Sequence, residues 1–286
     1  MSSKTLQQRT KASLGREAFI EVEPGVRLHV IDWGEGPPVV LIPGYPLGAG
    51  SYEYTFHALV KAGFRAIGIS TRGFGKSDQP YGKYDYEVFT DDIKVILETL
   101  DIKNACISGH SMGGSIAIRF VSKFGGEHVG KLALFAAAAP RHVKIPEYPY
   151  PAFEKKEITR WVDGLSINRP AILGEIDAKF TVSPTSISAA IGAWLGGLSD
   201  EASPYAMVHA LTALRDEDLR EDLPNIKVPT LLLHARQDQI AAFALAEQMH
   251  AIIKNSELVV FEKSGHALFL EEQEKFNDEF IKFLKK

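Results

Sequence analysis

The segment Gly109-His110-Ser111-Met112-Gly113 constrains the fold of this chain more than any other. It matches the pattern G-x-S-x-G, which requires a strand before the serine and a helix after it. The apolar run Ala105–Ser108 precedes the motif and a helical pattern, Gly113–Phe124, follows it, whereas a chance match in a glycine-rich turn would lack this context. The two glycines supply the small neighbours that a strained turn needs. We therefore predict that Ser111 is a nucleophile held above a sheet edge.

Strands and helices alternate on both sides of this motif. Strands are predicted at Phe19–Glu23, Arg27–Trp33, Val39–Ile42, Phe64–Ile69, Ala105–Ser108, Lys131–Phe135, Thr230–His234 and Glu257–Phe261. Helices are predicted at Tyr52–Ala62, Tyr86–Leu100, Gly113–Phe124, Phe243–Ile253 and Ala267–Leu284. The first two strands flank a Pro-Gly turn and form a hairpin. Strands that alternate with amphipathic helices predict an α/β fold, here a mostly parallel eight-stranded sheet flanked by helices.

Residues 141–215 interrupt the alternation and contain no strand pattern. Helical patterns occur around Phe153–Asp163, Pro170–Phe180, Pro184–Trp194 and Pro204–Leu214, several of them opening near a proline. We interpret this block as a helical cap over the C-terminal ends of the strands, with residues 1–140 and 216–286 forming the core. Its large apolar side chains include Phe153, Trp161, Phe180, Trp194 and Met207. Such side chains serve packing more often than substrate contact, so none is assigned a binding role.

A serine hydroxyl needs a base within hydrogen-bond reach to take its proton. In this fold the catalytic residues follow the order Ser, then Asp or Glu, then His along the chain. Four histidines lie well beyond Ser111, namely His209, His234, His250 and His266. Only His266 is expected in a loop after a late strand, because the other three fall in the cap, a strand and a helix. We therefore predict that His266 is the base.

The acid that orients the base is expected one strand earlier. Asp238 lies in the loop after Thr230–His234 and 28 residues before His266. The segment after the preceding strand, 136–140, carries no acid, and the charge run 216–218 is typical of a solvated helix face. We predict that Asp238 holds His266 in the useful tautomer and stabilises the imidazolium.

Acyl transfer also needs two backbone N–H groups aimed at the oxyanion. One is expected from Met112, directly after the nucleophile. The other is expected from the loop after Val39–Ile42, where Tyr45 has an N–H and follows a glycine, whereas Pro46 has none to donate. We therefore predict that the oxyanion donors are the Tyr45 and Met112 backbone groups.

Composition limits the classes of partner and the cellular compartment that we expect for this chain. Of 286 residues, 45% are hydrophobic and the formal net charge is -4, which argues against nucleic-acid binding because phosphate contacts need clustered Lys and Arg. The single cysteine, Cys106, permits no intrachain disulfide and fits a reducing compartment. The polar segment 1–16 does not resemble a secretory signal, and no apolar run approaches the roughly 18 residues of a membrane helix. We expect a cytoplasmic protein without a membrane or nucleic-acid partner.

Four sequence strings carry a family resemblance: Ile42–Leu47, Arg72–Ser77, Gly109–Gly114 and Ser264–His266. They resemble the cofactor-free (non-haem) haloperoxidase and aryl-esterase branch of the α/β-hydrolase superfamily. That family carries an aromatic residue at the position of Tyr45, and Pro46 matches a proline of its perhydrolytic members. The chain departs from the family at Pro43, where His is common, and at Ser70, where Asp is usual.

The resemblance implies hydrolysis of carboxylic esters through an acyl-enzyme, with no metal or organic cofactor and with a small-molecule ester-like substrate. Formation of peracids from a carboxylic acid and hydrogen peroxide is the first alternative, and lactone hydrolysis is another. A ligand receptor with slow turnover is the alternative outside the enzymes. Haloalkane dehalogenases and epoxide hydrolases of this fold use an aspartate nucleophile, so Ser111 argues against both. We expect a small to medium, apolar acyl or alcohol group.

Overall fold

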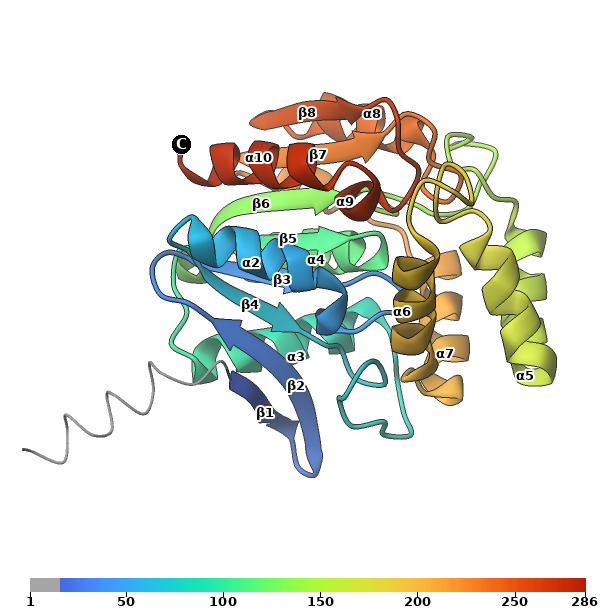
Figure 1. Ribbon diagram of the computed structural model, residues 1–286, viewed down its shortest axis with the longest axis horizontal. Coiled ribbons are helices and arrows are strands. Elements are labelled where there is room, and N and C mark those ends of the chain that lie inside the picture. Colours follow the sequence, from blue (N-terminus) through green and yellow to red (C-terminus); the bar gives the residue numbers. More distant parts are fainter. Residues whose placement is uncertain (1–15) are drawn as a thin grey trace, which may run out of the picture.

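A computed structural model describes residues 16–286, and the predicted N-terminal features at 1–15 lie outside this range (Figure 1). Within it, eight strands form one sheet in the order β1-β2-β4-β3-β5-β6-β7-β8. The strands are β1 (Arg16–Glu23), β2 (Val26–Trp33), β3 (Pro38–Ile42), β4 (Arg65–Ile69), β5 (Ala105–His110), β6 (Val129–Phe135), β7 (Thr230–Ala235) and β8 (Ser256–Phe261). Only β1–β2 and β2–β4 pair antiparallel. This confirms the predicted mostly parallel α/β sheet.

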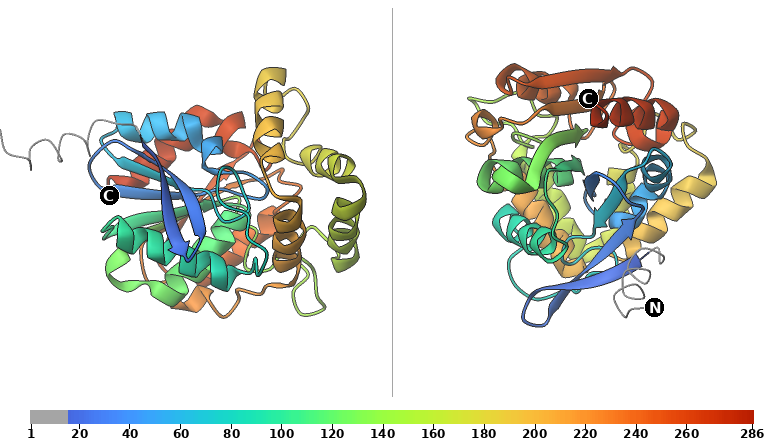
Figure 2. Two further views of the ribbon diagram at one scale, coloured as in Figure 1. Left: turned by 90° about the horizontal axis from the view of Figure 1, so that it is seen from below. Right: turned by 90° about the vertical axis from the view of Figure 1, so that its left-hand side faces the viewer.

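Helices cover both faces of this sheet (Figure 2). They are α2 (Glu53–Lys61), α3 (Tyr86–Thr99), α4 (Met112–Phe124), α8 (Phe243–Ile252), α9 (Leu268–Glu271) and α10 (Gln273–Leu284). Side chains of α2, α9 and α10 share one buried cluster with one face, and those of α3, α4 and α8 share a second cluster with the other. The central strand β5 is therefore buried along its whole length. Its carboxyl end is thus held by packing on both sides.

The packing of α10 shows how the sequence pattern fixes the layers. Phe276 and Phe280 are spaced one helical turn apart and fully buried, with ring centroids 4.8 and 4.9 Å from Phe135 of β6. Each such buried aromatic side chain contributes about 2 kcal/mol from removal of its surface from water. The helix predicted at 267–284 is broken at Glu272, whose φ of −122° and ψ of 50° are not helical, so that α9 and α10 are separate.

Three further helices lie at the carboxyl ends of the parallel strands, on the right of Figure 1. They are α5 (Lys155–Asp177), α6 (Ala189–Asp200) and α7 (Pro204–Asp216). The two helices predicted around 153–163 and 170–180 are present as the two halves of α5, which meet at a kink at the non-helical Asn168. The helix predicted to open at Pro184 begins at Ala189, because the Ser188 side chain caps it by accepting a hydrogen bond from Ile191 N. The division of the chain into core and cap at 141 and 215 stays a prediction.

None of the helices in residues 16–286 combines the length and the apolar character needed to cross a bilayer.

Candidate active site

Ser111 occupies the junction between β5 and α4. Its φ of 53° is in the left-handed region, which a residue other than glycine adopts only when its surroundings impose it. Those surroundings are backbone contacts with the next strand. Ser111 N donates to Phe135 O at 2.9 Å, and Ser111 O accepts from Ala138 N at 3.1 Å. The serine is therefore fixed in a strained turn at the N-terminus of α4, where the helix dipole favours negative charge.

Glycines allow three segments to meet at this turn. A Cβ on Gly109 would lie 2.1 Å from Gly113 O, and one on Gly113 would lie 2.2 Å from Ile42 O. A Cβ on Gly44 would lie 2.9 Å from the Cβ of Ser111. No side chain fits at any of these positions unless the neighbouring atoms move, so the motif's glycines serve close approach as the sequence indicated.

The structure brings the predicted base and acid together. His266 Nδ1 lies 2.7 Å from Asp238 Oδ2, and both side chains are buried. The other carboxylate oxygen, Oδ1, accepts from Ile240 N and Ala241 N, each at 2.8 Å. The orientation of the carboxylate is thus set by the turn that carries it. It can hold the imidazole with its proton on Nδ1 and leave Nε2 as the acceptor.

Burial sets the protonation of this pair. Desolvation lowers the pKa of His266 to about 3, so the imidazole is neutral at pH 7. Desolvation also raises the pKa of Asp238 to about 6, while nearby His234 and the two N–H donors act in the opposite direction. At neutral pH the site therefore holds a carboxylate and a neutral imidazole, which is the state that a general base requires.

His110, the residue before the nucleophile, joins the base to the elbow. Its Nε2 lies 2.9 Å from the His266 carbonyl oxygen, and the two rings are 4.6 Å apart. Burial lowers the pKa of His110 to about 3, so this ring is neutral and Nε2 can donate to the carbonyl. The sequence pattern gives His110 no role beyond its place in the motif. Only its position beside Ser111, facing inward at the end of a buried strand, could have indicated one.

Glu271 at the end of α9 connects the base loop to the segment after α5. One oxygen, Oε2, accepts from Gly265 N at 2.7 Å. The other, Oε1, accepts from Val182 N at 2.7 Å and from the Ser186 hydroxyl at 2.6 Å. The sequence pattern does not single out this residue, because a glutamate in a helix is typical of a solvated face.

The two predicted oxyanion donors lie on the segments that approach Ser111. Tyr45 follows the glycine packed against the serine, and Met112 is the first residue of α4. Among residues 16–286, neither backbone N–H donates to another protein atom. Both groups are therefore available to a bound oxyanion. The Tyr45 hydroxyl is buried without a partner in the same range, and burial raises its pKa.

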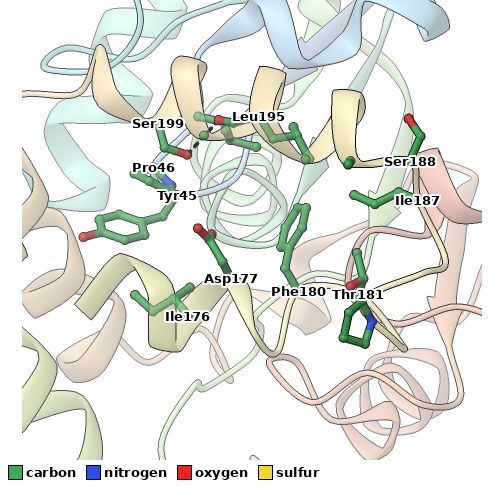
Figure 3. Close-up of a pocket in the computed structure, with 15 residues that line it drawn as sticks. Tyr45, Pro46, Ile176, Asp177, Phe180, Thr181, Ile187, Ser188, Leu195 and Ser199 are labelled. Atoms are coloured by element: carbon green, nitrogen blue, oxygen red, sulfur yellow. Dashed lines mark hydrogen bonds between the residues drawn. The ribbon is translucent and has the colours of Figure 1, made fainter. Parts of the chain in front are cut away.

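A cavity of about 170 Å³ lies between the Tyr45 loop and helices α5 and α6 (Figure 3). Cavities of roughly 150 Å³ hold a benzene-sized group, so this space suits a small to medium substituent. Phe180 lines it, and its ring is 5.7 Å from His266 and 6.0 Å from His110. Phe180 therefore borders both the cavity and the base. Ser111, Asp238 and His266 do not themselves line the cavity.

The other large side chains singled out in residues 141–215 behave differently. Phe153, Trp161 and Met207 are buried in the core, and Trp194 packs against Tyr54 with ring centroids 5.8 Å apart. In the described part of the chain, no group of three or more His, Cys, Asp or Glu side chains is placed to hold a metal ion.

Comparison with known proteins gives consistent matches along nearly the whole chain. Residues 37–273 match the family described as serine aminopeptidase, S33. The AB hydrolase superfamily protein YisY of Bacillus subtilis (strain 168) is 43% identical over 265 residues, which cover 93% of this chain and 98% of that protein.

Two solved structures share the fold closely. The esterase EaEST from Exiguobacterium antarcticum superposes with a TM-score of 0.91 at 37% identity and covers 95% of this chain and 100% of its own. The bromoperoxidase from Bacillus anthracis gives a TM-score of 0.92 at 32% identity, with the same coverage of 95% and 100%.

Proposed function

The chain belongs to the α/β-hydrolase superfamily, in the branch that contains the non-haem haloperoxidases, and we propose that it hydrolyses carboxylic esters through an acyl-enzyme on Ser111. The buried Asp238–His266 pair, held against the elbow by His110, is the observation that carries this proposal. The imidazole is neutral and oriented, and its ring lies 4.6 Å from that of His110, the residue before the strained serine. A base held close to a serine in this way can activate its hydroxyl.

The proposed reaction has two halves. In the first, Ser111 Oγ attacks the ester carbonyl while His266 Nε2 accepts its proton, and the Tyr45 and Met112 N–H groups bind the oxyanion. The carbon–oxygen bond to the alcohol then breaks as His266 returns the proton to that alcohol. In the second half, water attacks the acyl-enzyme with His266 again as base. The carboxylic acid leaves, and Ser111 regains its proton.

Steady-state hydrolysis of a short-chain 4-nitrophenyl ester tests this proposal. We expect Ser111→Ala to lower kcat by a factor on the order of 10⁵, because the nucleophile acts as a unit with its base. Ser122→Ala, on the same helix but bonded to Asn225 at the surface, is the matched control and keeps the wild-type rate. Equal rates for wild type and Ser111→Ala would disprove the proposal.

Peracid formation is the second candidate, because the similar bromoperoxidase bears the name of an oxidising activity. It needs the same acyl-enzyme, with hydrogen peroxide in place of water as the acceptor. Bromination of monochlorodimedone in acetate, bromide and peroxide measures it. A peroxide-dependent rate greater than the rate of ester hydrolysis would reverse the order of the two candidates.

A further inference from the structure

The cavity beside the base is mostly apolar, and its polar side chains are those of Tyr45, Thr181, Ser188 and Ser199 together with one carboxylate. Asp177 is the sole charged residue among the fifteen that line it. Figure 3 shows this carboxylate between Tyr45 and Phe180, directed toward helix α6. Its neighbours on the wall include Pro46, Ile176 and Leu195. A charge here acts on whatever group enters, and because the residue is over a third exposed, the apolar walls reduce its screening by water only in part.

The protein does little to stabilise this negative charge. Asp177 is the last residue of α5, where the helix dipole favours cations, and that last turn contains no basic residue. Within residues 16–286 its carboxylate has no hydrogen bond and no ion pair. Partial burial and the nearby Asp200 both raise its pKa.

The nearby cations do not pair with Asp177, although the charge of Arg169 also acts on Tyr45 of the cavity wall. Arg169 donates to Ala202 O at 3.2 Å and lies 4.0 Å from Asp200, while Lys179 lies 6.0 Å from the centre of the Phe153 ring. An acid that makes no contact with these groups serves no structural pairing. It is therefore available to a ligand that enters the cavity.

The aromatic rings on either side add to the attraction for a cation. Phe180 and Tyr45 both line the cavity, and the face of an aromatic ring carries partial negative charge. A carboxylate beside aromatic walls is the combination that binds ammonium and quaternary ammonium groups. The same combination repels an anion and offers a neutral alkyl group only apolar contact.

We propose that Asp177 makes the cavity selective for esters that carry a positively charged nitrogen, and that it disfavours substrates that carry a carboxylate. This inference rests on the proposed ester hydrolysis. It also sets the rank of the two candidate activities, because the acid substrate of peracid formation is an anion at neutral pH and is repelled by the same side chain.

Matched substrates isolate the charge. Choline acetate and 3,3-dimethylbutyl acetate have the same shape and place the charge on the alcohol part. Betaine methyl ester and methyl 3,3-dimethylbutanoate place it on the acyl part. Monomethyl succinate and methyl pentanoate test an anion. Acid release is followed by pH-stat, and each kcat/KM is expressed relative to that of the neutral partner.

We expect wild type to favour the charged member of at least one cationic pair, and Asp177→Asn to reduce that preference about tenfold. The same variant raises the relative rate on monomethyl succinate. Asp177→Glu, which keeps the charge, retains the preference. Asp200→Asn removes a nearby carboxylate that does not line the cavity and changes the preference by about twofold or less.

Thermal unfolding shows whether each variant is folded. The salt dependence of the wild-type enzyme provides a test that needs no variant, because raising the ionic strength from about 0.01 to 0.5 M must weaken the preference. A preference that is absent in wild type, insensitive to salt, or equally reduced by Asp177→Asn and Asp200→Asn would overturn the inference. Loss of all Ser111-dependent turnover on the neutral esters would instead overturn the proposed function.

Discussion

The elbow and the cavity are neighbours built by opposite means. At the elbow, a Cβ on Gly113 would meet Ile42 O at 2.2 Å, so backbone packs directly on backbone. In helix α6, Gly192 lines the cavity and a Cβ there would meet nothing within 4 Å. The same residue type thus marks crowding in one region and free space in the other. The reacting groups are placed by main-chain contacts, whereas the cavity is shaped by side chains.

The two aspartates show the same contrast in electrostatics. Asp238 is fully buried and bonded to two backbone N–H groups and an imidazole. Asp177 is over a third exposed and has no partner in the described part of the chain. The Asp238 carboxylate is therefore oriented by protein groups before a substrate binds. The Asp177 carboxylate is left for a ligand to pair with. Four predictions test this comparison.

Asp238→Asn gives the largest expected effect. The amide cannot hold the proton of His266 on Nδ1 in the useful tautomer, so kcat falls by about 10⁴ while the fold is retained. Steady-state kinetics measures the loss, and an unchanged unfolding midpoint in urea shows that structure is retained. A loss of less than about tenfold would show that the carboxylate does not orient the base.

Gly113→Ala is expected to lower the free energy of unfolding by about 3 kcal/mol, because the new methyl group forces the Ile42 backbone away. Urea unfolding measures this change, and ester hydrolysis falls with it as the serine turn distorts. Wild-type stability in this variant would contradict the view that main-chain contact fixes the elbow.

The pH dependence of kcat/KM follows from the buried pair. Protonation of Asp238, with a pKa of about 6, removes the charge that stabilises the imidazolium, and His266 stays neutral well below that pH. We therefore expect a plateau above about pH 7 and a tenfold fall per pH unit below about pH 6. If the folded enzyme kept its full activity at pH 5, the Asp238–His266 pair would have to become protonated below that pH, contrary to this prediction.

Gly192→Ala has the smallest expected effect, and it stabilises the protein where Gly113→Ala destabilises it. Alanine is the better helix former, and the site is open, so the free energy of unfolding rises by about 0.5–1 kcal/mol. The methyl group also narrows the cavity and shifts preference toward shorter acyl or alcohol groups. Gly197→Ala, on the same helix but not lining the cavity, is expected to stabilise without this shift. An equal shift in both variants would place the substrate elsewhere.

Strand and helix positions in the core could be predicted because the local pattern and the packing agree there. All eight predicted strands are present, since β5 and its neighbours are apolar runs that burial requires. In residues 141–215 the pattern does not fix the bounds of α5 and α6. The kink at Asn168 and the start at Ala189 coincide with side-chain caps, because Asn168 Oδ1 accepts from Ala171 N and the Ser188 side chain accepts from Ile191 N. Periodicity alone does not report such caps.

The candidate site divides in the same way. Ser111, Asp238 and His266 follow from their order along the chain and from loops that end strands. The roles of His110 and Glu271 depend on bonds between distant segments, such as the bond between Ser186 and Glu271, which are 85 residues apart. The role of Asp177 depends on its place in the cavity wall. No local pattern encodes such contacts. Their roles could be recognised only once the segments were placed in space.

The bond between His110 and the His266 carbonyl spans 156 positions of the chain and has a further consequence. This bond attaches the loop that carries the base directly to the end of the strand that carries the nucleophile. A shift in the position of the intervening residues therefore need not change the distance between the two reactive groups. Helices α5 to α7 all lie within that interval. Mutations in these helices can change substrate selectivity while the relative positions of the nucleophile and the base are kept. A chain built in this way can acquire new substrates without having to reacquire its chemistry.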